Sequence, residues 1–266
     1  MINDMKISLP QSLKSFIGNQ PLQKDKVGQS PSDVYSFTKN NEKYYLKTTE
    51  LTYAQTTYSV IREAKMLVWL DGKLNVPELV LMDTDHENEY MISKAVPAKP
   101  LQDFTGKSDQ FFIDIYTDAL TQLQSISIKN CPFISNKKFR LAEAEFFLEN
   151  GLLDELDDDE KDLTLWSDYQ NFAELLDDLK QQNFQEEYVF SHGDLTDSNV
   201  FLSHDAQIYF LDVGRAGIAD RFVDIAFIER SLREDCSEDA ALQFLNHLAE
   251  DDAFKRNYFL KLDELN

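Results

Sequence analysis

Short runs of alternating hydrophobic and polar residues in the first third of the chain predict β-strands. Two such runs, 34–38 and 43–48, flank the polar stretch KNNE, which is typical of a hairpin turn. Residues 76–83 and 88–95 predict two more strands. Between the two pairs, apolar residues recur at helical spacing over 56–74. The pattern therefore predicts a small antiparallel sheet with one main helix.

The pattern after residue 95 changes to longer helical periods. Helices are expected over 109–126, 140–151 and 168–182, and further helices are expected from 219 to the C-terminus, including one over 219–235. Two short strands are expected near 199–202 and 207–211. Because prolines interrupt the pattern near 95–100, we expect an N-terminal lobe over 1–95 and a larger, mostly helical C-terminal lobe over 96–266. The predicted fold class is α+β with two lobes.

Charge is distributed unequally along the 266 residues. The net charge is −22, of which residues 1–95 contribute −1 and residues 96–266 contribute −21. An acidic surface repels nucleic acid and anionic membranes and attracts cations, although many acidic proteins gain only solubility from such a charge. The charge predicts no nucleic-acid or membrane partner, and it favours a cationic partner for the second lobe.

Compartment can also be predicted from the sequence. No apolar run is long enough for a bilayer span, and the N-terminus lacks the apolar core of a signal peptide. The two cysteines, Cys131 and Cys236, indicate neither a disulfide framework nor a metal cluster. We therefore expect a soluble, cytoplasmic protein.

Candidate chemistry concentrates in the stretch YVFSHGDLTDSNVFL, residues 188–202. The expected hairpin that follows would bring its two ends together, with Asn199 beside Asp212. Two oxygen-bearing side chains at a hairpin mouth suit a hard cation such as Mg²⁺. Asp194 lies one short turn earlier, where a carboxylate can accept a proton or orient a hydroxyl. Alone, a short HGD motif is more often an ordinary turn with a capping aspartate.

The ordered set of motifs resembles the aminoglycoside 3'-phosphotransferases of the protein-kinase-like superfamily. HGDLTDSN has the Asp-x-x-x-x-Asn spacing of a kinase catalytic loop. The stretches YLK, TTYSVIREAKMLVWL, FSHGDLTDSN, FLDVGRAGIADRFVDIAF, REDCSE and LDEL extend the resemblance over nearly the whole chain. The resemblance implies a two-lobed protein-kinase-like fold. It also implies Asp194 as the catalytic base and Asn199 and Asp212 as Mg²⁺ ligands.

The resemblance also implies a nucleotide site in the first lobe, for ATP or GTP. Lys47 would meet the α- and β-phosphates and pair with Glu63, although an exposed strand lysine and a solvated helix glutamate are the ordinary alternatives. A local ion pair of Glu63 with Arg62 or Lys65 is a further alternative. The loop GQSPSD departs from the glycine-rich loop of protein kinases, and the amide of Ser30 would contact phosphate. Tyr45 would stack on adenine, while Tyr44 should face the other way, and ordinary strand packing is the alternative for both. Three residues lie where the backbone of the family's interlobe hinge would form hydrogen bonds with adenine: Ile92, Ser93 and Ala95.

Carboxylates of the second lobe would bind the ammonium groups of an aminoglycoside such as kanamycin or neomycin. The expected substrate-binding residues are Asp157, Glu160, Arg215, Glu234, Asp235, Glu264 and Asn266. Asp157 and Glu160 belong to an acidic run that would ordinarily be a solvated surface loop. The family commonly ends in an aromatic residue, whereas this chain ends in Asn266.

The predicted function is transfer of a γ-phosphate from a nucleoside triphosphate to the 3'-hydroxyl of an aminoglycoside, which would confer antibiotic resistance. One alternative is a kinase of the same fold that acts on choline, homoserine, a macrolide or a fructosamine. Another is a non-catalytic acidic module that captures a basic partner.

Overall fold

A computed structural model describes residues 9–25, 30–153 and 163–265 of the chain. The chain divides into two units. One comprises Met1–Ala98 together with Tyr209–Gly214, and the other comprises Lys99–Ile208 together with Arg215–Asn266. The first unit therefore takes a short segment from much later in the sequence, and that segment contains Asp212.

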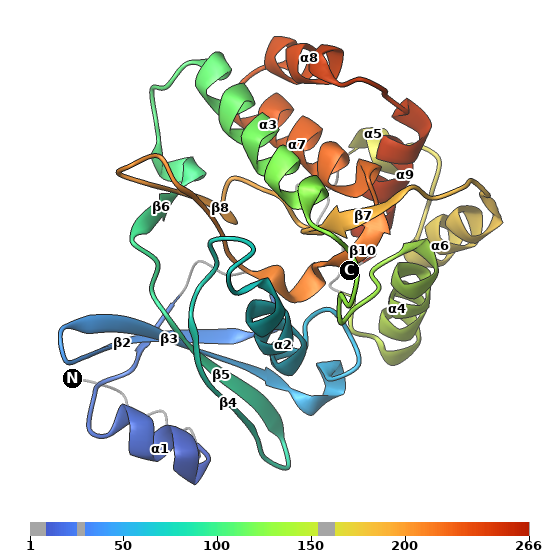
Figure 1. The fold of residues 1–266 in the computed structure, drawn as a ribbon. Helices are drawn as coiled ribbons and strands as arrows, with labels where there is room; N and C mark the ends of the chain where they lie inside the picture. The colour runs from blue at the N-terminus through green and yellow to red at the C-terminus, as the bar shows by residue number, and fades with distance from the viewer. Residues whose placement is uncertain (1–8, 26–29, 154–162, 266) are drawn as a thin grey trace. The chain divides into compact units, whose positions relative to one another are not determined.

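The first unit is built on a five-stranded antiparallel sheet with the order β1-β2-β3-β5-β4 (Figure 1). The strands are β1 (Gln23–Lys24), β2 (Asp33–Lys39), β3 (Glu42–Glu50), β4 (Leu79–Thr84) and β5 (Asn88–Lys94). Asn40 and Asn41 connect β2 to β3, and both have positive φ angles. Asparagine tolerates this left-handed conformation, which a tight two-residue hairpin requires. The four predicted strands of this lobe are confirmed.

Two helices of the first unit contact opposite faces of this sheet. Leu13 and Ile17 of α1 (Gln11–Ile17) pack into a hydrophobic cluster with Leu46 of β3. Side chains alternate along a strand, so the neighbouring Lys47 faces the other side, where it bonds Glu63 of α2 (Val60–Leu70). The face carrying Lys47 is therefore the one that positions the candidate site.

Helix α2 is shorter than the predicted 56–74. It begins after Ser59, whose hydroxyl accepts a hydrogen bond from the backbone N–H of Arg62 and so caps the helix. Residues 56–58 precede this cap, and Asp71 ends the helix ahead of Gly72, whose φ is +71°. Hydrophobic spacing alone did not reveal that Ser59 supplies the cap.

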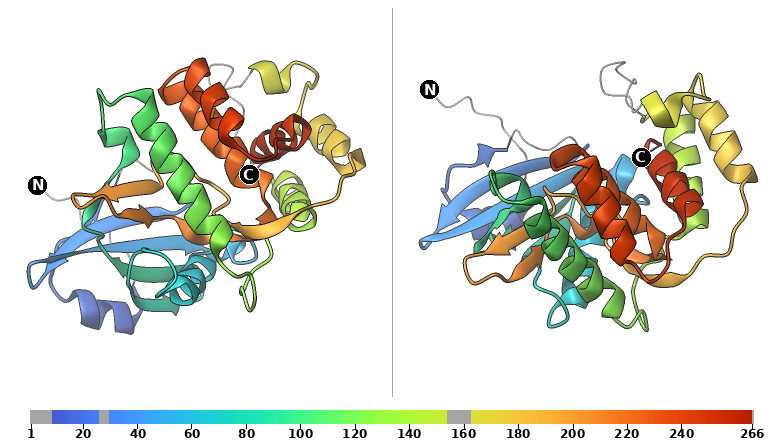
Figure 2. Two further views of the ribbon diagram at one scale, coloured as in Figure 1. Left: turned by 45° about the horizontal axis from the view of Figure 1, so that its top comes forward. Right: turned by 90° about the horizontal axis from the view of Figure 1, so that it is seen from above.

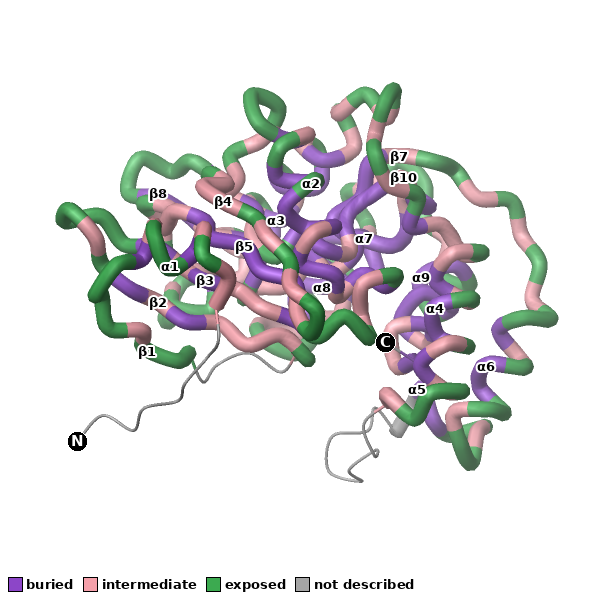
Figure 3. The backbone as a smooth tube through the Cα atoms, turned by 90° about the horizontal axis from the view of Figure 1, so that it is seen from below, coloured by how far each residue is buried: buried purple, intermediate pink, exposed green. Residues whose placement is uncertain are grey.

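The second unit is mostly helical. Its helices are α3 (Asp109–Ser125), α4 (Lys137–Asn150), α5 (Leu163–Trp166), α6 (Phe172–Gln181), α7 (Phe222–Asp235), α8 (Glu238–His247) and α9 (Ala253–Asp263). Helix α7 packs against α3, α8 and α9 (Figure 2). Most of its residues are buried, as the purple tube in Figure 3 shows. The core of this unit is therefore organised around α7.

Two small sheets complete the fold. Strand β7 (Tyr188–Ser191) pairs antiparallel with β10 (Gly217–Asp220), while β6 (Ala98–Pro100), β8 (Val200–Ser203) and β9 (Ile208–Phe210) form a sheet of order β6-β8-β9. The predicted strands near 199–202 and 207–211 are confirmed. The predicted helix over 219–235 is wrong at its start, because the residues before Phe222 pair with β7.

The remaining helix predictions hold with shifted ends. Helix α3 agrees closely with the expected 109–126, and α4 begins earlier than the expected 140–151 because Asn136 caps it. Asn171 likewise caps α6, which therefore starts later than the expected 168–182. In the described part of the chain, no helix combines the length and apolarity needed to cross a membrane.

The packing of α1 generates a stability prediction, because periodicity did not reveal this helix. Leu13 is 0% exposed, so Leu13→Ala should lower the free energy of unfolding by about 2–5 kcal/mol, measured by chemical denaturation. Leu242→Ala on the exposed face of α8 is the control and should change it by less than about 0.5 kcal/mol. Equal effects of the two substitutions would contradict the placement of α1 in the core.

Candidate active site

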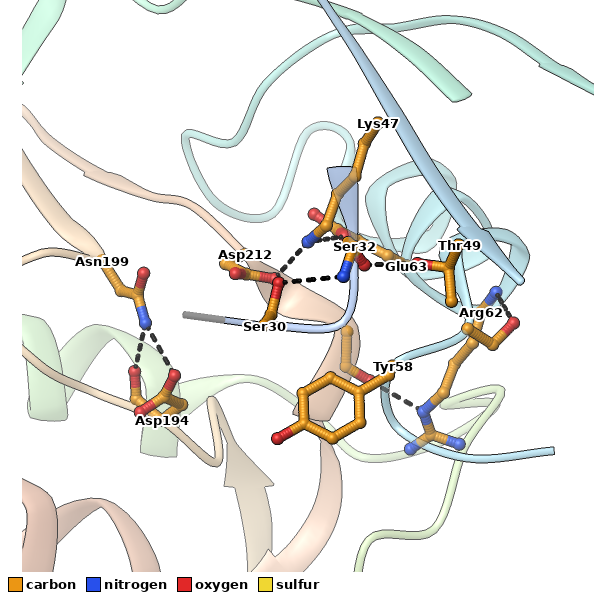
Figure 4. Close-up of polar contacts among 12 residues, drawn as sticks. Ser30, Ser32, Lys47, Thr49, Tyr58, Arg62, Glu63, Asp194, Asn199 and Asp212 are labelled. Atoms are coloured by element: carbon orange, nitrogen blue, oxygen red, sulfur yellow. Dashed lines mark hydrogen bonds and ion pairs between the residues drawn. The ribbon is translucent and has the colours of Figure 1, made fainter. Parts of the chain in front are cut away.

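A lysine held between two carboxylates forms the centre of the candidate site in the first unit (Figure 4). The Nζ atom of Lys47 lies 2.8 Å from Oε2 of Glu63 and 2.7 Å from Oδ1 of Asp212. Glu63 comes from α2, and Asp212 comes from the late segment that joins this unit. The expected pairing of Lys47 with Glu63 is present, and the structure adds Asp212 to the same ammonium.

The electrostatics of this cluster favour an additional cation. Burial lowers the pKa of Lys47, but the carboxylates of Asp212 and Glu63 outweigh that effect and hold it above its ordinary value. The pKa of Glu63 is raised to about 7. Burial is the main cause and the charge of Asp212 adds to it, while the charge of Lys47 acts in the opposite direction. Two carboxylates share one ammonium, so a further positive charge beside Asp212 would relieve the excess negative charge.

Asp212 is exposed enough to bind a ligand but has an unusual backbone. Its side chain is 46% exposed, whereas that of Glu63 is 7% exposed. Its φ angle is +54°, in the left-handed region that most residues avoid at a cost of about 1–2 kcal/mol. The surrounding contacts must hold this conformation, because the backbone alone disfavours it.

In the second unit, the catalytic-loop candidates Asp194 and Asn199 lie side by side. The Nδ2 atom of Asn199 donates to the backbone O and to Oδ2 of Asp194, both at 2.9 Å. These bonds orient the Asp194 carboxylate and use both amide hydrogens of Asn199. The side-chain Oδ1 of Asn199 is not used in these two bonds.

Buried backbone contacts fix this loop. The backbone N–H groups of His192 and Gly193 donate to Asp224 of α7 at 3.0 and 2.9 Å. Gly193 has a φ angle of +82°, and a Cβ at that position would lie 2.9 Å from the carbonyl oxygen of Arg215. Glycine is the residue that tolerates both the positive φ angle and the close approach to Arg215. The conformation of the loop before Asp194 therefore depends on Gly193.

The residues expected to hold Mg²⁺ have suitable donor atoms. Asn199 supplies an amide oxygen and Asp212 a carboxylate, which are the hard oxygen ligands that Mg²⁺ prefers, completed by water and phosphate. Within the described residues, no group of three or more His, Cys, Asp or Glu side chains forms a metal-binding cluster. The amide and carboxylate oxygens of Asn199 and Asp212 are hard donors that fit Mg²⁺, whereas zinc is more often bound through nitrogen and sulfur. Asn199 and Asp212 belong to different units, and their expected proximity stays a prediction.

Tyr45 lies on the same face of β3 as Lys47 and is half-buried. Tyr44 faces the other way and stacks against Phe37, as expected. Ser30 accepts a hydrogen bond from the backbone N–H of Ser32 at 3.4 Å. The contacts of Ser30 and Tyr45 with a nucleotide stay predictions.

The residues expected at the hinge take part in cross-strand contacts with β3 in this structure. Ser93 pairs with Tyr45 in the sheet, and Ala95 donates its backbone N–H to the carbonyl of Lys43 at 3.0 Å. An adenine bond to the Ala95 amide would have to share or replace that hydrogen bond. The adenine contacts expected at Ser93 and Ala95 also stay predictions.

Arg215 is one of two arginines that hold a buried aspartate. It donates to Asp263 at 2.6 Å, and Arg230 donates to the other oxygen at 3.0 Å. Burial raises the pKa of Asp263, but the attraction of Arg215, Arg230 and the nearby Arg140 outweighs it and leaves the pKa below its ordinary value. Asp263 is therefore ionised, and it ties Arg215, which precedes β10, and Arg230 of α7 to the end of α9.

Glu264 follows Asp263 and accepts a hydrogen bond from the indole N–H of Trp166 at 2.8 Å. Trp166 is 7% exposed and lies just after the acidic run of the sequence. No sequence pattern indicated that Trp166 would orient Glu264. Asp157, Glu160 and Asn266 lie outside the described residues.

Asp197 is a further candidate that the sequence analysis missed. Burial, together with the negative charges of Asp235 and Glu234, raises its pKa to about 6. Glu234 and Asp235 are exposed at the end of α7, and burial also raises the pKa of Asp235. The three carboxylates repel one another, so a polyammonium ligand would stabilise them together.

Comparisons with known proteins agree on a family. The model of a family described as "Phosphotransferase enzyme family" matches residues 22–258. The chain is 54% identical to an aminoglycoside 3'-phosphotransferase of Acinetobacter baumannii, over 98% of this chain and 100% of that one. It is 36% identical to an aminoglycoside 3'-phosphotransferase of Enterococcus faecalis, over 98% and 99%.

Solved structures share the fold. A crystal structure of an aminoglycoside 3'-phosphotransferase of type VIII has a TM-score of 0.76 and 23% identity, covering 96% of this chain and 97% of that one. An aminoglycoside phosphotransferase from Streptomyces rimosus in complex with ADP and streptomycin has a TM-score of 0.71 and 18% identity, covering 95% of each chain. The predicted α+β kinase-like fold is confirmed.

The anchoring of the loop by Asp224 can be tested without an activity assay. Asp224→Asn replaces one acceptor with an amide that cannot accept both backbone N–H bonds, so hydrogen exchange at His192 and Gly193 should accelerate. Asp220→Asn is the matched control, because Asp220 is equally buried at 0% exposure but contacts other groups. Unchanged exchange in Asp224→Asn, or the same acceleration in both variants, would contradict the assignment.

Proposed function

Because the chain belongs to the phosphotransferase enzyme family, we propose that it is an aminoglycoside 3'-phosphotransferase that confers resistance to aminoglycoside antibiotics. The observation that carries the phosphotransfer activity is the ammonium of Lys47 between Glu63 and Asp212. The names of the full-length relatives support the acceptor, because they are aminoglycoside 3'-phosphotransferases. ATP or GTP supplies the phosphate, and the reaction takes place in the cytoplasm.

In the proposed mechanism, this chain mainly positions the two substrates and neutralises the charge of the phosphates. Lys47, oriented by Glu63, binds the phosphates of the donor. The backbone amide of Ser30 contacts the same phosphates. Asn199 and Asp212 would hold Mg²⁺, which supplies neutralisation of the phosphate charge when it is bound. Tyr45 stacks on the base, and the backbone at Ser93 and Ala95 lies along its edge.

Asp194 is the proposed catalytic base. Its carboxylate, held by Asn199, accepts the proton of the 3'-hydroxyl as the new oxygen–phosphorus bond forms and the bond from the γ-phosphorus to the bridging oxygen breaks. Transfer of the phosphoryl group leaves the nucleoside diphosphate. The fixed orientation of Asp194 supports this role, because a base must already point at the hydroxyl.

Acidic groups of the second unit would bind the amines of the drug, such as kanamycin or neomycin. The proposed groups within the described residues are Glu234, Asp235 and Glu264. The proposed groups outside them are Asp157, Glu160 and Asn266. Arg215 acts by holding Asp263 next to Glu264. The concentration of negative charge in residues 96–266 supports a polycationic substrate.

An acceptor panel tests the proposed function. The purified protein is incubated with Mg²⁺ and ATP or GTP, and nucleoside diphosphate release is measured with kanamycin, neomycin, choline, homoserine, a macrolide and a fructosamine. Aminoglycoside-dependent release, with one added phosphate located on the 3'-oxygen by mass spectrometry and NMR, is expected. Release with another acceptor alone would reject the proposed substrate, and no release with any acceptor would reject the activity.

Substitution of the base should separate turnover from binding. Asp194→Ala is expected to lower kcat by about 10²- to 10⁴-fold, because proton acceptance is lost. Nucleotide affinity, measured by calorimetry, should stay nearly unchanged. Asp239→Ala on the exposed surface of α8 is the control and should leave both values unchanged. Near-normal turnover in Asp194→Ala would show that another group takes the proton.

The raised pKa of Asp197 predicts a pH dependence of aminoglycoside binding. Below a pH of about 6, Asp197 becomes protonated and no longer attracts an ammonium group. Affinity for kanamycin, measured by calorimetry, should therefore fall by about tenfold as the pH drops through this value. Asp197→Asn should bind weakly at both ends of the range and lack this step. An identical pH profile in the variant would exclude Asp197 as the responsible group.

A further inference from the structure

A buried arginine connects the helix that carries Glu63 to the segment that carries Asp212. Arg62 precedes Glu63 on α2 and is only 8% exposed. Its Nε donates to the carbonyl oxygen of Gly214 at 2.8 Å, although the two residues are 152 positions apart. Figure 4 shows this bond beside the Lys47 cluster. The link reaches the backbone two residues after Asp212.

Gly214 permits an approach that any other residue would prevent. A Cβ at this position would lie 2.7 Å from the backbone oxygen of Thr57, which is closer than real Cβ contacts, and 3.8 Å from Cβ of Glu63. Thr57 lies just before α2, and Glu63 lies in its first turn. The backbone at Gly214 therefore rests directly against the start of α2. Arg62 donates to the carbonyl oxygen of Gly214, which would otherwise be buried without this hydrogen bond.

The link acts on a residue whose backbone needs support. Asp212 has a φ angle of +54°, and its carboxylate is bound by Lys47. The side-chain bond fixes the carboxylate, but it does not act directly on the backbone that follows Asp212. The bond from Arg62 to Gly214 constrains that backbone relative to the same helix that orients Lys47 through Glu63.

We propose that Arg62 is a positioning residue, which fixes the 212–214 segment on α2 so that Asp212 is held ready for a metal–nucleotide complex before that complex binds. The inference rests on the proposed role of Asp212 as a Mg²⁺ ligand. Arg62 touches no reacting atom in this account. Arg62 limits the conformations of Asp212 in the free protein. Binding of the metal–nucleotide complex then costs less conformational entropy.

A matched pair of substitutions tests the proposal against a merely structural role. Arg62→Lys keeps the charge but loses the planar Nε–H donor. Arg256→Lys is the control, because Arg256 is also 8% exposed and bonds Glu229 and Asp251 in the second unit. Both variants should unfold at lower temperature. Only Arg62→Lys should bind Mg²⁺–AMP-PNP more weakly, by about tenfold in calorimetry, with metal-free AMP-PNP affected much less.

Two additional measurements strengthen the test. Gly214→Ala disrupts the same contact from the other side, so it should weaken Mg²⁺–AMP-PNP binding, and combining it with Arg62→Lys should cost less than the sum of the two effects. Hydrogen exchange at residues 212–214 should accelerate in both variants. In the kinetic assay, kcat and the KM for Mg²⁺–nucleotide should change while the KM for kanamycin stays the same.

The outcomes are distinguishable. If Arg62→Lys behaves like Arg256→Lys, with a lower unfolding temperature and unchanged Mg²⁺–AMP-PNP affinity, the proposal is wrong. Binding of AMP-PNP by the unaltered protein that does not depend on Mg²⁺ also overturns it. Failure of the unaltered protein to phosphorylate any aminoglycoside would reject the proposed function, yet a selective loss of Mg²⁺–AMP-PNP affinity in Arg62→Lys would still support the positioning role.

Discussion

The ammonium of Lys47 between two carboxylates is the interaction on which the site in the first unit depends. A charge with little solvent contact is costly unless opposite charges compensate it, and here three distant parts of the chain supply the three members. Strand β3 places Lys47, α2 places Glu63, and the late segment places Asp212. The requirement for compensation thereby connects the sheet, the helix and the late segment into one arrangement.

The second unit fixes its candidate residues through the backbone. Asp224 of the buried helix α7 binds the amides of His192 and Gly193, and the absence of a side chain at Gly193 lets the loop pass close to Arg215. A buried helix is a rigid support, so the loop takes its position from the core. The carboxylates proposed to bind substrate differ, because the negative charges of Asp235 and Glu234 raise the pKa of Asp197. A loop fixed by the core beside mutually repelling carboxylates is consistent with the proposal that this unit binds a polycation.

Local patterns predicted much of this fold but not the contacts that connect its parts. Alternation and turn residues identified the hairpin at Asn40, and helical spacing identified α2 and α3. The first residue of α7 was misplaced, because the strand pairing of β10 with β7 depends on tertiary contacts. Helix α1 is short, with Leu13 and Ile17 as its buried residues, so its periodicity is weak.

The candidate site divides in the same way. Motif order led to Lys47, Glu63 and Asp194, because their residue types are tied to the chemistry at fixed spacings. It did not lead to Arg62, Trp166 or Asp197, whose roles depend on what lies opposite them in space. An arginine next to a helix glutamate resembles any surface ion pair until the structure shows the carbonyl of Gly214 at its Nε. Sequence motifs therefore nominate candidate reacting groups, and they do not indicate the groups that contact those candidates in space.

The most direct test of the central claim is a crystal structure of the protein with Mg²⁺ and AMP-PNP. The account predicts that Nζ of Lys47 lies within about 3.2 Å of a phosphate oxygen while it keeps its bond to Glu63, and that Asp212 turns a carboxylate oxygen to the metal at about 2.1 Å. Phosphates bound elsewhere, with Lys47 still confined to its two carboxylates, would contradict it.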